Sequence, residues 1–325
     1  MSGPSAAEIV RGVLAGETRA VARAISLVED GAPAAREIVG AVHRKAGRAW
    51  IIGVTGPPGA GKSTLVDALG AAFRMQGRRV GIVAVDPTSA FSGGAVLGDR
   101  IRMQRHNVDP GVYIRSMATR GHFGGLSRAT ADAADILDAA GYEVILLETV
   151  GVGQDEVEVV RAADCVMVVL VPGLGDDIQA IKAGLLEVAD VYVLNKADRD
   201  GIEKLETEIA NMLSLGEETG RPRPRIVRTV AFLGKGLDDL LRAAIDHRTV
   251  AEATGAADAR RRERSRWRLL DLVRERVLVW ASERTEGGGG LEAAVARLCR
   301  REIDPYEAAD SILGAFASQA GGRPL

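Results

Sequence analysis

One stretch near residue 50 constrains the fold more than any other part of the chain. Residues 50–55 form a short apolar run, and a loop that contains Gly56, Gly59 and Gly61 follows it directly. Lys62 and Ser63 then begin a segment with the apolar spacing of a helix. A strand that passes through a glycine-rich turn into a helix is a building block of parallel α/β sheets. The sequence therefore predicts an α/β protein with this unit near the start of its sheet.

The glycine-rich loop fits the pattern G-x-x-x-x-G-K-[ST] in the strand–loop–helix context that a P-loop requires. Glycines let several backbone N–H groups point at phosphate oxygens, and the helix N-terminus adds its positive dipole end. We expect Lys62 to neutralise the β- and γ-phosphates of a nucleotide and the Ser63 hydroxyl to bind Mg²⁺. The alternative is a glycine-rich turn that only resembles a P-loop. The nucleotide-binding candidates are Gly56, Pro57, Pro58, Gly59, Ala60, Gly61, Lys62, Ser63 and Thr64.

After residue 50, short apolar runs alternate with amphipathic segments, which predicts a mostly parallel sheet flanked by helices. The expected strands are 50–55, 80–86, 112–116, 143–149, 165–171, 190–195 and 225–230. The expected helices between them are 61–76, 126–140, 154–163, 176–188, 200–216 and 236–247. Right-handed crossovers would bring the loops that follow the strands to one edge of the sheet.

The rest of the chain is predicted to be helical. We divide the sequence into an N-terminal helical extension (1–47), a P-loop domain (48–248) and a helical C-terminal arm (249–325). In the arm, Leu270, Val273, Val277 and Trp280 recur at helical spacing and form one apolar stripe. Shorter helices are expected at about 291–300 and 306–317.

Composition narrows the classes of function. The formal net charge of −2 gives no general attraction to nucleic acid or to acidic membranes. Cys165 and Cys299 are far apart, which argues against a disulfide framework or a zinc motif, and Cys165 opens an apolar run as a buried strand residue would. We see no signal peptide and no apolar run long enough for a membrane span, so we expect a soluble, cytoplasmic protein.

Carboxylates at the ends of predicted strands are candidates for catalysis. Glu148 closes the strand Val-Ile-Leu-Leu-Glu and is followed by Gly151, where a nucleotidase places a metal-side acid and a switch glycine. Asp86 closes another strand, and Asp99 follows it in a glycine-rich segment. We expect Glu148 and Asp86, with Ser63, to serve the Mg²⁺ ion. The alternative is that Asp86 and Asp99 cap helices or lie in solvated turns.

The motif Asn195-Lys196-Ala-Asp198 follows the apolar run 191–194 and predicts recognition of guanine. A carboxylate at Asp198 can accept hydrogen bonds from both guanine N1–H and N2–H₂, a donor pair that adenine lacks. The Lys196 stem can lie over the base, and Asn195 can tie the loop together. After the next predicted strand, Val230, Ala231 and Phe232 are candidates to offer a backbone N–H to the base, although a simple turn explains them equally well. The predicted ligands are therefore GTP and GDP.

With these motifs in hand, the chain resembles the MeaB-type, or ArgK-like, methylmalonyl-CoA mutase-associated GTPases. The matching segments span about residues 50–240, at 56–64, 85–89, 93–100, 119–126, 148–154, 175–182 and 195–198. The helical extensions also fit the family layout. One departure is Val230-Ala231, where the family often has Ser-Ala.

The resemblance implies a GTPase that acts as a chaperone of adenosylcobalamin-dependent methylmalonyl-CoA mutase, gating cofactor loading and protecting the mutase. It also implies a homodimer with a contribution from the C-terminal arm. By the same resemblance, a switch segment would couple the mutase to the nucleotide through Asp176, Asp177, Gln179 and Lys182. From the residues alone, this segment is an amphipathic helix whose acids suit the helix dipole. A related mutase of the isobutyryl- or ethylmalonyl-type is the alternative partner.

Other classes of protein fit the sequence less well. A transport ATPase for basic amino acids is at odds with the guanine motif. A module with a vestigial P-loop is at odds with Lys62, Ser63 and Glu148. The basic run 260–266 is better explained as a solvated helix face than as a nucleic-acid site. Because no glutamine directly follows Gly151 and no arginine finger is evident, we expect slow intrinsic hydrolysis.

Overall fold

Seven parallel strands form the centre of the computed structural model, which describes residues 4–86, 109–118, 125–149, 161–173, 188–215, 223–283 and 290–320. The strand order is β3-β2-β4-β1-β5-β6-β7. The strands are β1 (Trp50–Thr55), β2 (Val80–Asp86), β3 (Val112–Ala118), β4 (Val144–Thr149), β5 (Cys165–Leu170), β6 (Val191–Leu194) and β7 (Arg225–Arg228). The predicted α/β class with a parallel sheet is confirmed.

The chain builds the sheet outward from β1 in two directions. Strands β2, β3 and β4 lie on one side of β1, and β5, β6 and β7 lie on the other. In such a sheet, ligands bind at the carboxyl ends of the strands where the order reverses. The loop after β1 therefore lies at the position that the topology favours for a ligand.

Alternate residues of the strands face two separate cores, one on each side of the sheet. Ile145 and Leu147 of β4 belong to one core, whereas Val144 and Leu146 belong to the other. Because both faces are covered, the central strands are apolar at nearly every position. This explains why apolar runs, rather than strict alternation, marked these strands in the sequence.

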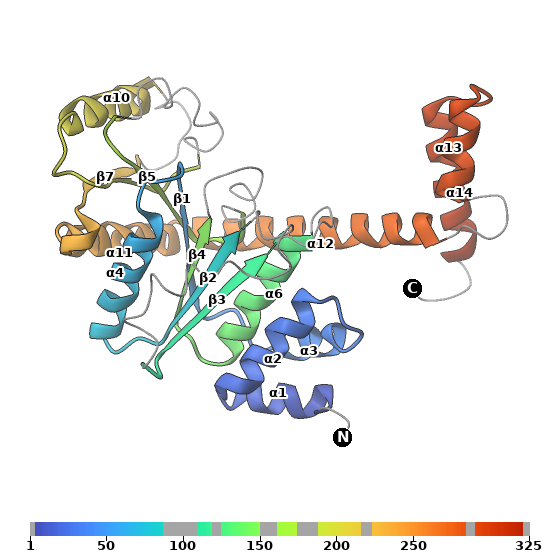
Figure 1. Ribbon diagram of the computed structural model, residues 1–325, viewed down its shortest axis with the longest axis horizontal. Coiled ribbons are helices and arrows are strands. Elements are labelled where there is room, and N and C mark those ends of the chain that lie inside the picture. Colours follow the sequence, from blue (N-terminus) through green and yellow to red (C-terminus); the bar gives the residue numbers. More distant parts are fainter. Residues whose placement is uncertain are drawn as a thin grey trace. The chain divides into compact units, whose positions relative to one another are not determined.

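Different helices cover the two faces (Figure 1). Helices α6 (Gly125–Ala139) and α10 (Ile202–Leu215) pack on one core, and α4 (Lys62–Met75) and α11 (Leu237–Ala253) pack on the other. Helix α11 continues six residues beyond the predicted end at 247, since no glycine or proline interrupts the chain before Gly255. Helix α4 begins directly after the glycine-rich loop, so its N-terminus faces the carboxyl edge of the sheet.

The N-terminal residues fold into three short helices that pack on α6 (Figure 1). These helices are α1 (Ala6–Leu14), α2 (Thr18–Glu29) and α3 (Ala35–His43). Glu29 of α2 forms an ion pair with Arg115 of β3, and His43 Nδ1 of α3 lies 2.8 Å from Asp135 Oδ2 of α6. These contacts hold α2 against β3 and α3 against α6.

The described residues group into two compact units, Met1–Arg264 and Ser265–Leu325. Helix α12 (Ala256–Glu283) begins in the first unit, and the second also holds α13 (Leu291–Cys299) and α14 (Pro305–Ala320). The three domain ranges taken from the sequence stay a prediction. Among the described residues, no helix combines the length and apolar character needed to cross a membrane.

Candidate functional site: the phosphate and base loops

The backbone of the loop after β1 requires glycine at two positions for different reasons. Gly56 has a φ of 138°, and a Cβ atom there would lie 2.2 Å from the carbonyl oxygen of Val169 in β5. Gly61 has a φ of 87°, and its Cβ would lie 2.6 Å from Nδ2 of Asn195. A Cβ on Gly59 would meet nothing within 4 Å. The loop is thus pressed against its neighbours at both ends, and its middle glycine faces open space.

Lys62 is the first residue of α4, and its ammonium group lies inside the loop. Its Nζ donates hydrogen bonds to the carbonyl oxygens of Gly56 at 2.8 Å and Pro57 at 3.0 Å. The residue is only 5% exposed. A buried ammonium group encircled by a glycine-rich turn at a helix N-terminus offers positive charge to an anion, as a phosphate-binding loop requires.

Ser63 and Glu148, which the sequence analysis assigned to one Mg²⁺ ion, meet at the carboxyl edge of the sheet. Ser63 Oγ donates to Glu148 Oε1 at 2.5 Å, and Glu148 is 3% exposed. Neighbouring residues Thr149 and Thr55 are also joined, by a hydrogen bond of 3.1 Å between their hydroxyl groups. A hydroxyl and a carboxylate this close supply hard oxygen ligands, the kind that Mg²⁺ prefers.

Asn195 connects three segments of the site. Its Nδ2 donates to the carbonyl oxygen of Ala60 at 2.9 Å, and its Oδ1 accepts from the backbone N–H of Ala231 at 3.1 Å and from Thr229 Oγ1 at 3.2 Å. The residue is 3% exposed. The amide therefore uses both of its ends to hold the loops after β1, β6 and β7 together.

Lys196 adds a second tie between the loops after β1 and β6. Its backbone has a φ of 56°, an uncommon conformation for a residue other than glycine. Its Nζ donates to the carbonyl oxygen of Gly59 at 2.7 Å. Asp198, two residues later, is exposed. The lysine stem thus extends toward the phosphate loop, whereas the aspartate carboxylate remains accessible to a ligand.

The segment after β7 is a short 3₁₀ helix (Ala231–Leu233), and the strand ends two residues before the predicted end at 230. It ends there because Val230 pairs instead with Lys235 in an antiparallel bridge. Val230 and Ala231 are buried, whereas Phe232 is 64% exposed. The Ala231 N–H donates to Asn195 Oδ1 in this structure, so it helps to join the loops after β6 and β7.

Thr229 is a site residue that the sequence analysis missed. It is 1% exposed and joins two partners: its N–H donates to the Leu194 carbonyl oxygen at 2.9 Å, and its hydroxyl donates to Asn195. The only signal in the sequence for this role was the position of Thr229 directly before Val230. That signal is weak because threonine is common at the ends of strands.

Several predicted residues lie outside the part of the chain that the structure describes. Asp86 is the last residue of β2, but only its backbone is described. Most of the predicted helices 154–163 and 176–188 also lie outside the described ranges. The same is true of six predicted site residues: Asp99, Gly151, Asp176, Asp177, Gln179 and Lys182.

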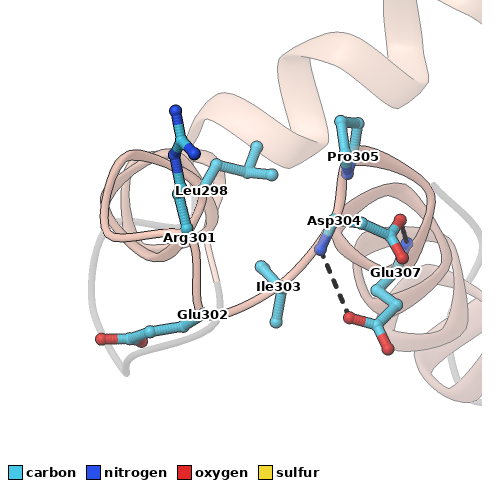
Figure 2. A pocket seen from close by; sticks show the side chains of 7 residues that line it. All are labelled: Leu298, Arg301, Glu302, Ile303, Asp304, Pro305 and Glu307. Atoms are coloured by element: carbon cyan, nitrogen blue, oxygen red, sulfur yellow. Dashed lines mark hydrogen bonds between the residues drawn. The ribbon is translucent and has the colours of Figure 1, made fainter.

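A surface hollow lies within the second compact unit. It is lined by residues between 298 and 307, in the turn between α13 and α14 (Figure 2). Asp304 Oδ1 accepts from the N–H groups of Tyr306 at 2.7 Å and Glu307 at 3.0 Å, and Glu307 accepts from the Asp304 N–H at 3.3 Å. This reciprocal arrangement caps helix α14. The hollow therefore lies beside a helix cap, and no predicted site residue lines it.

Comparison with known proteins agrees with this geometry. Residues 21–286 match the family described as methylmalonyl Co-A mutase-associated GTPase MeaB. A protein of Pyrococcus abyssi whose name describes it as a GTPase is 48% identical over 94% of this chain and 95% of its own length. The mouse protein named methylmalonic aciduria type A homolog, mitochondrial, is 32% identical over 95% of this chain and 79% of its own length.

A solved structure extends the likeness to three dimensions. The crystal structure of a LAO/AO transport system kinase superposes with a TM-score of 0.70 at 27% identity and covers 98% of this chain and 99% of its own. In this structure, buried hydrogen bonds join the loops that bind phosphate and guanine in GTPases. The relatives of the chain are GTPases as well. We conclude that this protein is a P-loop GTPase that belongs to the MeaB family of methylmalonyl-CoA mutase-associated GTPases.

Proposed function

We propose that this GTPase is a chaperone of adenosylcobalamin-dependent methylmalonyl-CoA mutase, which gates cofactor loading and protects the mutase. Membership of the MeaB family is the single observation that carries this proposal. The relationship to the mouse protein named for methylmalonic aciduria supports it. A related acyl-CoA mutase, of the isobutyryl- or ethylmalonyl-type, is the alternative client.

GTP would bind with its phosphates on the loop after β1. The N-terminus of α4 and the buried ammonium group of Lys62 would attract the phosphates, and the open side of Gly59 leaves room for them. In this proposal Lys62 gives up its bonds to the loop carbonyls in exchange for phosphate oxygens, which is favourable because charge-assisted hydrogen bonds are the stronger ones. The same loop, Gly56 to Thr64, supplies the surrounding N–H groups.

The residues at the carboxyl edge fit a Mg²⁺ ion. Ser63 Oγ and Glu148 Oε1 lie 2.5 Å apart and both are hard oxygen donors. When bound, the ion would offset the negative charge of the β- and γ-phosphates. We propose Ser63, Glu148 and Asp86 as its protein partners, with Asp99 and Gly151 acting at the γ-phosphate.

The guanine base would lie beside the loop after β6. The exposed carboxylate of Asp198 would accept from guanine N1–H and N2–H₂, while Lys196 covers the base with its stem. Val230, Ala231 and Phe232 would border the base from the segment after β7. Asn195 acts on the base indirectly, by fixing the loops that carry these groups.

The mutase would act through the segment at 175–182, where Asp176, Asp177, Gln179 and Lys182 would couple it to the nucleotide. We propose that the isolated protein hydrolyses GTP slowly and that binding of the mutase rearranges this segment and accelerates hydrolysis. Fast single-turnover hydrolysis by the isolated protein would contradict this part of the proposal.

We also propose a homodimer built by the C-terminal arm. In α12, Leu269 is 62% exposed, Leu270 49% and Val273 50%, and in α14 Leu313 is 50% exposed. Large apolar side chains gathered on exposed helices are typical of surfaces that another chain covers. Sedimentation of the full chain would show a dimer, and replacing Leu270 and Val273 with glutamate would shift it toward the monomer.

The decisive experiment measures GTP turnover with and without purified adenosylcobalamin-dependent methylmalonyl-CoA mutase, with ATP as the matched control. The proposal predicts that the mutase accelerates hydrolysis of GTP and leaves that of ATP unchanged. If GTP is hydrolysed but no cobalamin-dependent acyl-CoA mutase changes the rate, the chaperone role is wrong and the GTPase activity stands. A preference for ATP would instead favour the rival reading as a transport ATPase.

A further inference from the structure

Three potential metal ligands meet at the amino-terminal edge of the sheet, opposite the nucleotide loops. Cys165 is the first residue of β5, Asp190 directly precedes β6, and His247 lies on α11. One potential ligand atom from each lies within 4.8 Å of the other two. Neither the sequence motifs nor the proposed GTPase chemistry uses any of the three.

The carboxylate of Asp190 is already oriented toward this cluster. Its Oδ2 accepts hydrogen bonds from the Val166 N–H at 2.7 Å and from Arg260 Nη1 at 2.7 Å. Its other oxygen, Oδ1, lies 3.5 Å from His247 Nε2, too far for a good hydrogen bond. Outer hydrogen bonds of this kind fix the direction of a ligating carboxylate in known metal sites.

His247 contributes an imidazole that has unused hydrogen-bonding capacity at one ring nitrogen. Its Nδ1 is buried and has no hydrogen-bond partner among the described residues. A buried polar atom without a partner costs free energy, so such an atom calls for an explanation. Because the side chains of His247 and Asp190 are 20% and 19% exposed, an ion can reach the cluster from solvent.

Cys165 contributes a thiol at the inner side of the cluster. It is a free cysteine and is 1% exposed. Burial and the nearby charge of Asp190 raise the pKa of the thiol, so without a cation it keeps its proton. A divalent ion that binds there would displace this proton to solvent, and the resulting thiolate would add its negative charge to that of Asp190, which Arg260 already offsets in part.

We propose that Cys165, Asp190 and His247 form a binding site for a divalent transition metal of the zinc class. A sulfur, a nitrogen and an oxygen donor together suit zinc or cobalt better than Mg²⁺. Ligand atoms around tetrahedral zinc lie about 3.5 Å apart. The potential ligand atoms here lie within 4.8 Å of one another, so modest side-chain rotation would bring them to that distance. Water would fill the fourth position. Arg260 shares Asp190 with the ion, and its positive charge keeps the affinity moderate.

Cobalt alone is the probe for this site, because a thiolate bound to Co²⁺ gives a charge-transfer absorption in the near ultraviolet. The full-length protein is freed of metal with a chelator and titrated with Co²⁺ without nucleotide. The wild type should bind one cobalt ion with this absorption. Cys165→Ser should abolish the absorption, and His247→Asn should weaken binding at least ~10-fold.

The second cysteine supplies a matched control. Cys299 is exposed and free, and Cys299→Ser should leave the absorption and the affinity unchanged. Absence of the absorption in the wild type, or its persistence in Cys165→Ser, would overturn the proposal. His247→Asn keeps the test decisive if Cys165→Ser fails to fold. The result is independent of the GTPase reaction, since each variant's binding of GTP is measured separately and should be retained.

Discussion

Asn195 donates a hydrogen bond from Nδ2 to the carbonyl oxygen of Ala60, 2.9 Å away and 135 residues earlier in the chain. Through its Oδ1 the same amide holds Thr229 and Ala231. The guanine motif and the phosphate loop are therefore parts of one rigid arrangement rather than two separate ligand contacts. Loss of this residue should disturb phosphate binding as well as base recognition.

We predict that Asn195→Ala lowers GTP affinity at least ~10-fold and lowers the free energy of unfolding by about 2–4 kcal/mol, because several buried polar groups lose their partner at once. Calorimetric GTP titration and denaturant unfolding measure the two effects. Thr229→Val removes only one of these hydrogen bonds and should cost about 1 kcal/mol. Wild-type affinity in Asn195→Ala would contradict the role of the amide as a connector.

Asp198→Asn should exchange the base specificity of the protein. Without the carboxylate, the paired charge-assisted hydrogen bonds to guanine are lost, and GTP affinity should fall by about two orders of magnitude. An amide can instead donate to the C2 carbonyl oxygen of xanthine, so affinity for xanthosine triphosphate should rise. Competition binding with the two nucleotides measures both changes. Asp200→Asn, an exposed aspartate on the same loop, is the control and should change neither.

Gly56→Ala should destabilise the fold more than an alanine at an ordinary glycine turn. Its Cβ would lie 2.2 Å from the Val169 carbonyl oxygen at a φ of 138°, so strand β5 or the loop must move. We expect a loss of about 3 kcal/mol. The control is Gly31→Ala, where φ is 62° and nothing lies within 4 Å, so only about 1 kcal/mol should be lost. Equal losses in the two variants, measured by denaturant unfolding, would show that the loop relaxes freely.

Tyr192 should make the protein less stable at high pH. Burial raises its pKa from 10.0 to about 12. The folded state therefore keeps its proton while the unfolded state loses it, so stability is fully present below about pH 10 and declines as the pH rises toward 12. At about pH 11 the loss is about 1.4 kcal/mol.

The matched variant for this prediction is Tyr192→Phe, which cannot ionise. Denaturant unfolding at about pH 8 and about pH 11 is compared for the two proteins. Between these two pH values, Tyr192→Phe should lose about 1.4 kcal/mol less of its free energy of unfolding than the wild type does. Identical changes in both proteins would mean that Tyr192 does not titrate as its burial implies.

The sequence by itself determined the local units of this protein. The glycine-rich loop, the Asn195–Asp198 motif and the apolar strands are contiguous, so their chemistry and periodicity can be read from neighbouring residues. The boundaries of β1 and β2 were predicted to the residue, because buried strands in a two-faced sheet are apolar throughout. The ends of longer helices such as α11 were predicted less accurately, because amphipathic spacing fades gradually at exposed helix ends.

Only the tertiary structure decided which of these units meet. The order of the strands brings Ser63 to Glu148 across 85 residues and Asn195 to Ala60 across 135. It also gathers Cys165, Asp190 and His247 at the opposite edge, where no local motif marks them. The physical reason is that a parallel sheet joins strands through crossovers, so neighbours in space come from distant parts of the chain and are selected by packing of the whole sheet.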